Sequence, residues 1–141
     1  MVSALSIFAG RFLLGLYFIL PGLLKVMAPE ATIAYMQSHA IAFAPLLMWI
    51  AAATNILGGL LLMAGRHVKL VAYGFVVYVL LVNVMLHDFW TMTGDGVAHE
   101  RQNFIKNLAI LAGLLVLAGH APARNPFTKD WWRGDSALRS R

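Results

Sequence analysis

The sequence has no cysteine and few charged residues: Asp, Glu, Lys and Arg make up 12% of 141 residues, whereas soluble domains carry about a quarter. The missing cysteine excludes disulfides, thiol catalysis and iron–sulfur ligation by the chain itself. What the chain does contain is apolar, since hydrophobic residues make up 60% of it and the mean hydropathy is +0.73. This composition is typical of an integral membrane protein surrounded by a lipid bilayer.

Four apolar stretches are long enough to cross a membrane as helices, because each crossing needs about 20 residues. Their continuous apolar character lacks the alternation of a barrel wall, so helices are favoured over strands. The first stretch looks like a secretory signal, but no Lys or Arg precedes it and Arg11 interrupts it, so we predict that it is retained. The predicted spans are SIFAGRFLLGLYFILPGLLKV, 44–65, 70–90 and 103–119.

The connections between the spans define the topology. Only GRHVK joins the second and third spans, which forces an antiparallel hairpin. In the longer connection between the first two spans, Pro29 suits a first helical turn and apolar residues follow it at helical spacing. We therefore predict an all-α fold: a four-helix transmembrane bundle over 1–119, with a short interfacial helix between spans one and two, followed by a basic and aromatic tail over 120–141.

Lysine and arginine gather at one end of the predicted bundle. Arg66 and Lys69 lie in the short turn and further basic residues lie in the tail, whereas the two longer loops are more acidic. The positive-inside rule therefore predicts that both termini are cytoplasmic and that the loop around Asp95 lies outside. The net charge is +5, but in this arrangement the basic residues lie next to lipid headgroups, so nucleic-acid binding is not expected.

Polar residues recur at helical spacing at the end of the third span and at the start of the fourth. A loop of about a dozen residues joins these spans, so they should pack as neighbours and the two polar stripes should meet. Because ionisable groups inside a membrane are costly when unpaired, we expect Asp88 to pair with Lys106 or with Lys25. The predicted ligand-binding residues are Lys25, Asn83, His87, Asp88, Trp90, Asn103, Lys106 and Asn107.

This polar cluster has two interpretations that the residues alone leave open. In the functional one, it forms a pocket in the outer leaflet for a small redox-active or lipid-like headgroup, such as a quinone, with His87 as a proton partner. In the structural one, the lysines snorkel, Trp90 is an ordinary interfacial aromatic and the asparagines bond neighbouring helices. A metal or transport site is disfavoured and no metal ligand is predicted, because HE at 99–100 lacks the HExxH spacing. Its candidates would be His39, His87, His99, Asp88 and Glu100.

Glycines mark expected helix contacts in the first two spans. Gly15 and Gly22 share one face of the first span with Arg11 and Lys25, which permits close approach of a neighbouring helix. We interpret Arg11 as a structural residue that snorkels to the inner edge. In the second span, Asn55 lies near the centre and is followed by paired glycines, so we predict that it forms an interhelical hydrogen bond.

The ordered motifs RFLLGLYFILPGLLK, NILGGLLLMAG, HDFW and NFIKNLAILAGLLVLA resemble the DoxX family of small four-helix membrane proteins. The resemblance implies an inner-membrane protein associated with oxidoreduction, including quinone-dependent oxidation of sulfur compounds, with a membrane or peripheral redox protein as partner. Many members carry a glutamate where this chain has Asn55, so a proton-carrying role is not expected there. The residues that match the family pattern are Arg11, Lys25, Gly58, Gly59, His87, Phe89, Trp90, Asn103, Lys106 and Asn107.

We therefore predict a quinone-linked membrane subunit of an oxidoreductase, in which the chain has no haem, flavin or nicotinamide motif of its own. The alternative is a non-catalytic interaction or assembly subunit, favoured by the small size and by a tail that mixes aromatic and basic residues. The ligand, the partner protein and the oligomeric state are not defined by the sequence, which leaves a homo-oligomer open.

Overall fold

A computed structural model describes residues 2–123, 125, 127 and 131–135. Among these residues, four helices are long and apolar enough to cross a membrane, which confirms the predicted all-α bundle. A short helix lies between the first two of them, as predicted, with Pro29 in its first turn. The elements in chain order are α1 (Val2–Met27), α2 (Pro29–Ser38), α3 (Ala44–Ala64), α4 (Val68–Leu86), η1 (Phe89–Thr91) and α5 (Gly96–His120).

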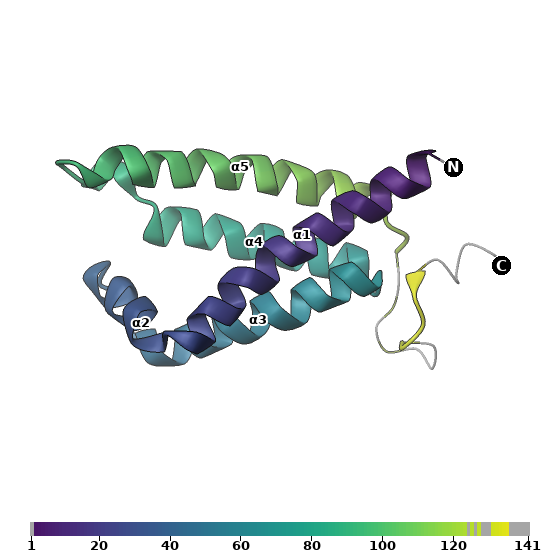
Figure 1. The fold of residues 1–141 in the computed structure, drawn as a ribbon, viewed down its shortest axis with the longest axis horizontal. Coiled ribbons are helices and arrows are strands. Elements are labelled where there is room, and N and C mark those ends of the chain that lie inside the picture. Colours follow the sequence, from purple (N-terminus) through teal and green to yellow (C-terminus); the bar gives the residue numbers. More distant parts are fainter. Residues whose placement is uncertain (1, 124, 126, 128–130, 136–141) are drawn as a thin grey trace.

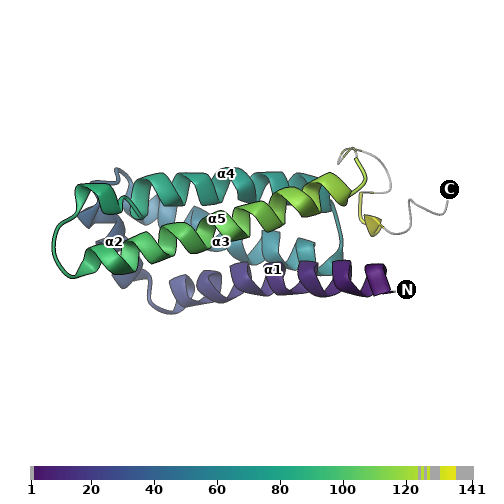
Figure 2. The ribbon, with the colours of Figure 1, turned by 90° about the horizontal axis from the view of Figure 1, so that it is seen from above.

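The long helices pack as two pairs, α1 along α3 and α4 along α5 (Figures 1 and 2). α2 and η1 lie at one end of the bundle, which we call the α2 end. The tight α3–α4 turn lies at the opposite end, which we call the turn end. The start of α1 and the described part of the tail also lie at the turn end (Figure 1), so the described portions of both terminal segments share one side of the bundle.

Glycines allow α1 and α3 to approach closely, as the sequence predicted. A Cβ atom added to Gly15 would lie 2.6 Å from the Gly59 carbonyl oxygen, and one added to Gly59 would lie 2.6 Å from the Gly15 carbonyl oxygen. A Cβ atom on Gly22 would meet Ile56 at 2.8 Å. Contact of this kind gives dispersion energy over a long interface, which is how helices associate where the hydrophobic effect does not act between them.

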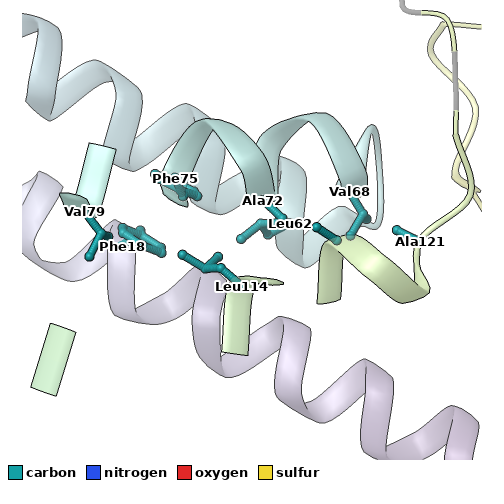
Figure 3. Packing of buried hydrophobic residues seen from close by; sticks show 9 residues of the cluster. Phe18, Leu62, Val68, Ala72, Phe75, Val79, Leu114 and Ala121 are labelled. Carbon is teal, nitrogen blue, oxygen red and sulfur yellow. The ribbon is translucent and has the colours of Figure 1, made fainter. Parts of the chain in front are cut away.

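Two stacked aromatic rings lie where the two helix pairs meet. Phe18 of α1 and Phe75 of α4 are buried with ring centroids 3.6 Å apart and planes 5° apart. Gly58 of α3 makes room for Phe75, since an added Cβ would lie 2.6 Å from the ring. Leu114 of α5 and Val79 of α4 belong to the same buried cluster (Figure 3), so side chains from all four long helices form one core.

The described part of the tail docks on the turn end. Asp135 is buried, and its carboxylate oxygens accept hydrogen bonds from the amides of His67 and Val68 at 3.1 and 2.9 Å. The Asp135 amide donates to the Gly65 carbonyl oxygen at 2.9 Å. The first amides of α4 have no partner within that helix, so Asp135 acts as its N-terminal cap. The division of the chain at residue 120 stays a prediction, but this contact ties the tail to the bundle.

Candidate ligand-binding site at the α2 end

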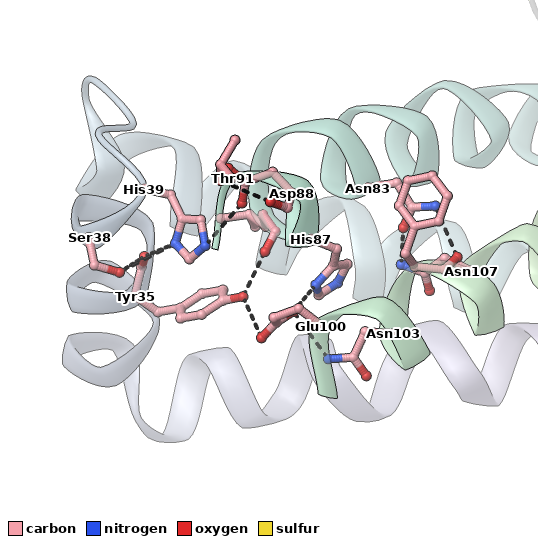
Figure 4. A network of polar contacts seen from close by, with 12 residues as sticks. Tyr35, Ser38, His39, Asn83, His87, Asp88, Thr91, Glu100, Asn103 and Asn107 are labelled. Atoms are coloured by element: carbon pink, nitrogen blue, oxygen red, sulfur yellow. Dashed lines mark hydrogen bonds and ion pairs between the residues drawn. The ribbon is translucent and has the colours of Figure 1, made fainter. Parts of the chain in front are cut away.

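A buried carboxylate joins the end of α4 to the start of α5. α4 ends at Leu86, and α5 already begins at Gly96, seven residues before the predicted start at Asn103. Glu100 is therefore a helical residue, 8% exposed, and its Oε2 lies 2.6 Å from Nδ1 of His87 (Figure 4).

Tyr35 brings α2 to the same carboxylate. Its hydroxyl oxygen lies 3.2 Å from Oε1 of Glu100 and 2.8 Å from the Leu86 carbonyl oxygen, so its single proton can be donated to either acceptor. The Asn103 amide also donates to Glu100 Oε2, at 3.4 Å. Burial, followed by the negative charge of Glu100, raises the pKa of the Tyr35 hydroxyl above its ordinary value. Tyr35 therefore stays a hydrogen-bond donor at physiological pH.

The expected pairing of Asp88 with Lys106 or Lys25 is wrong. Asp88 Oδ1 lies 3.5 Å from His39 Nε2, and Asp88 Oδ2 accepts a hydrogen bond from the Thr91 hydroxyl at 2.6 Å. The reason is that α4 ends before Asp88, so the chain turns into η1 and carries this carboxylate toward the end of α2 (Figure 4). Within the described residues, neither lysine forms an ion pair.

Buried amides connect three helices below this network. Asn107 of α5 donates to Oδ1 of Asn83 of α4 at 2.8 Å, and the Tyr17 hydroxyl of α1 donates to Oδ1 of Asn107 at 3.1 Å. The Asn83 amide also donates to the Phe104 carbonyl oxygen at 3.2 Å. Each of these asparagines has a structural role as an interhelical hydrogen-bond partner.

A cavity of about 510 Å³ lies among these residues in the half of the bundle nearer α2. Five of the eight predicted ligand-binding residues line it: Lys25, His87, Asn103, Lys106 and Asn107. The other three do not: Asn83 is buried beside it, Asp88 faces His39, and Trp90 is 55% exposed with its ring edge-on to Phe104. Ligand binding by the five stays a prediction.

The structure adds Tyr17, Asn55 and Tyr78 to the polar lining of this cavity. Asn55 is 2% exposed, and its side chain reaches the Tyr78 hydroxyl of α4, in line with the predicted interhelical bond. Its Oδ1 atom, however, accepts no hydrogen bond from any described residue. A buried carbonyl oxygen without a donor is unusual, and here it lies in the wall of a cavity.

The DoxX family model matches residues 6–88, which is more than half of the chain. The chain belongs to the DoxX family. It is similar to inner membrane protein YphA of Escherichia coli (strain K12), with 34% identity over 107 residues, or 76% of each chain. Together with the four apolar helices, this relative identifies a multi-pass inner-membrane protein. No solved structure matches the chain.

Two histidines of this DoxX protein each face one acidic side chain at the α2 end. His39 faces Asp88, and His87 faces Glu100. In the part of the chain that the structure describes, no three such side chains gather as a metal site would require.

Sequence reasoning did not include Glu100, Tyr35 or Tyr17 among the ligand-binding residues of this DoxX protein. Glu100 lies three residues before Asn103 and seven before Asn107, so it continues the polar stripe of α5 by one turn. That spacing was the available signal. Tyr35 and Tyr17 had none, because an isolated tyrosine near a membrane edge is ordinary.

Proposed function

We propose that this DoxX protein is a quinone-linked membrane subunit of a redox system and that the cavity lined by Lys25, Lys106 and His87 holds the quinone headgroup. When bound, the quinone supplies two-electron redox chemistry, and a partner redox protein exchanges the electrons. The chain's own residues hold the headgroup and manage its protons. The supporting observation is the set of polar side chains that line the cavity. This set includes two lysines, and none of the described residues that line the cavity is acidic.

The cavity wall offers mainly hydrogen-bond donors. Quinone carbonyls are acceptors, and two lysine ammonium groups together with the amides of Asn103 and Asn107 can donate to them. The orphaned Oδ1 of Asn55 supplies an acceptor for the hydroxyl of a reduced headgroup. Phe18, Pro21 and Ile110 line the rest with apolar surface, and about 510 Å³ lies within the range of small-molecule sites.

His87 lies between the cavity and the buried carboxylate. It lines the cavity, and its Nδ1 atom lies 2.6 Å from Oε2 of Glu100, an arrangement in which a carboxylate fixes the orientation of the imidazole ring. Tyr35 donates to the same carboxylate from α2. These contacts support a role for His87 in exchanging protons with the headgroup, with Glu100 as its positioning residue.

Native mass spectrometry of the gently extracted protein tests this proposal. The wild-type protein should carry a quinone, and Lys106→Met should lose most of it. Arg101→Met is a matched control, because Arg101 is an exposed basic residue of the same helix outside the cavity lining. The absence of quinone from the wild-type protein, or equal loss in both variants, would refute the headgroup site.

The alternative role as an assembly subunit is favoured by the tail. Phe127 is 93% exposed, and Trp131 and Trp132 are also exposed at the turn end. The Arg133 guanidinium lies 5.4 Å from the Trp132 ring centroid. Aromatic and arginine side chains of this kind are common at protein interfaces. Stoichiometric co-purification with an enzyme, without bound quinone, would favour this role over the first.

A further inference from the structure

A second cavity lies beside the polar one and differs from it in character. It has a volume of about 230 Å³ and lies under α2, between α3 and α4. Most of its wall is apolar, including Met36 and Ile41, Leu47 and Ile50, and Leu81 and Met85. We call this second cavity the apolar crevice.

The apolar crevice and the polar cavity are adjacent, because Lys25, Tyr78 and Val82 line both. Lys25 is half-buried at this boundary. A lysine can pack its apolar stem along one surface and direct its ammonium group to another. One side chain can therefore contact an apolar chain in the crevice and a polar headgroup in the neighbouring cavity.

We infer that the apolar crevice holds the hydrocarbon tail of a ligand whose headgroup occupies the polar cavity. The ligand class is an amphiphile with carbonyl or hydroxyl oxygens on a compact head and a long apolar chain. This inference rests on the proposed function for the position of the head. It adds that the protein binds ligands with a hydrocarbon tail more tightly than ligands without one. It also places that hydrocarbon tail beneath α2.

The contacts of α2 support this assignment. Met36 is buried on the face of α2 that covers the crevice. The hydroxyl of the adjacent residue, Tyr35, can donate to the Leu86 carbonyl oxygen at the end of α4 or to Glu100 of α5, and either bond holds α2 in place. The hydrogen bonds that build the polar network thus also fix the roof of the apolar crevice.

Binding of two quinones to the purified protein tests the inference. The probes are 2,3-dimethoxy-5-methyl-1,4-benzoquinone, which has no tail, and its 6-decyl analogue, titrated calorimetrically at one detergent concentration. The wild-type protein should bind the decyl analogue at least about tenfold more tightly, a ratio that needs burial of only about two methylene groups.

Two variants narrow the crevice from different helices. Ala51→Phe on α3 and Thr32→Trp on α2 change residues that line the crevice and not the polar cavity. Each should reduce the tail preference to less than about threefold, a remaining gain of under one methylene group, and leave binding of the tailless quinone unchanged. Ala53→Phe is the matched control, because Ala53 is an exposed residue of α3 outside both cavities, and it should keep the full preference.

The outcomes separate this inference from the proposed function. If both crevice variants keep the tail preference while the tailless quinone binds, the tail lies elsewhere and only this inference is overturned. If neither quinone binds the wild-type protein, both proposals are overturned. If native mass spectrometry finds a phospholipid that Ala51→Phe displaces, and the wild-type protein shows no tail preference, the apolar crevice is a lipid site and the inference is wrong.

Discussion

The carboxylate of Glu100 lies 2.6 Å from Nδ1 of His87, thirteen residues earlier in the chain. This contact joins the residue that follows α4 to the second turn of α5, and the Tyr35 hydroxyl brings α2 to the same carboxylate. Three elements therefore share one buried anion. Such an anion is stabilising only while its partners remain, because an uncompensated charge in a buried site is costly.

Glu100→Ala should destabilise the protein by about 2 kcal/mol, since it removes an acceptor shared by three half-buried side chains, Tyr35, His87 and Asn103. His87→Ala should be coupled to it: the double variant should cost less than the sum of the single ones by about 1 kcal/mol. Reversible unfolding in mixed detergent micelles measures these free energies in a double-mutant cycle.

A second double-mutant cycle, of Asp88 and Lys106, should show no coupling. Asp88 contacts Thr91 and His39, and Lys106 is exposed, so each alanine variant should cost less than about 1 kcal/mol. Their effects should also be additive. Coupling between Asp88 and Lys106, with none between Glu100 and His87, would contradict the arrangement described here.

The sequence predicted the bundle because hydrophobic runs report membrane crossings directly. The α3 span differs from its predicted bounds by one residue, since Gly65 ends it as a left-handed cap with φ +67°. The start of α5 was missed because its first two turns or so, through Gln102, include the polar run His99–Gln102. Hydropathy detects only the apolar part of a helix, whereas the backbone hydrogen bonds of α5 also include the polar residues that precede its apolar part.

The location of the candidate site could be predicted from the sequence, but the partners of its charged side chains could not. Five of the residues that line the polar cavity were found because polar stripes on neighbouring helices meet. The pairing failed because Asp88 lies only two residues beyond the end of α4, where a change in direction sends it toward His39. Tyr35 contacts Glu100 across 65 residues of sequence, and no local pattern reports a contact at that range.

Gly59→Ala should separate α1 from α3, because its Cβ would lie 2.6 Å from the backbone oxygen of Gly15, which has little freedom to move. We expect a loss of about 2 kcal/mol, as for overpacking of a core. Gly74→Ala is the control, since nothing lies within 4 Å of its added Cβ. That variant should be neutral or slightly stabilising in the same unfolding assay. Equal effects of the two variants would argue against a glycine-mediated interface.

Alkaline pH should destabilise the protein partly through Tyr35. Its pKa is raised in the folded state by burial and by Glu100, so the folded protein retains a proton that the unfolded chain releases above pH 10 or so. The resulting stability is complete below that pH and is lost as pH rises through it, by at most about 1.4 kcal/mol per pH unit. Stability measured between pH 9 and 11 should fall less steeply for Tyr35→Phe. Parallel curves for the two proteins would show that Tyr35 does not titrate differently on folding.

Asp135→Ala should destabilise the turn end by about 1 kcal/mol, the usual effect of losing a helix cap. Asp95→Ala is the control, because Asp95 precedes α5 but makes no side-chain capping bond.

Removing residues 127–141 should cost about as much stability as Asp135→Ala, leave the bundle folded and weaken its associations with partners. Complete unfolding after this truncation would show that the tail contributes more than a cap.

The orientation in the membrane can be tested directly because the chain has no cysteine of its own. Arg66, Lys69 and, in the described part of the tail, Arg133 are basic residues at the turn end, whereas Asp95 lies exposed before α5 at the other end. The positive-inside rule then predicts that the turn end is cytoplasmic. In intact cells, Asp95→Cys should react with a membrane-impermeant maleimide, and Arg66→Cys should react only after the membrane is permeabilised. Because the start of α1 and the docked Asp135 lie at the same end as Arg66, labelling of Arg66→Cys in intact cells would invert the orientation of both terminal segments together.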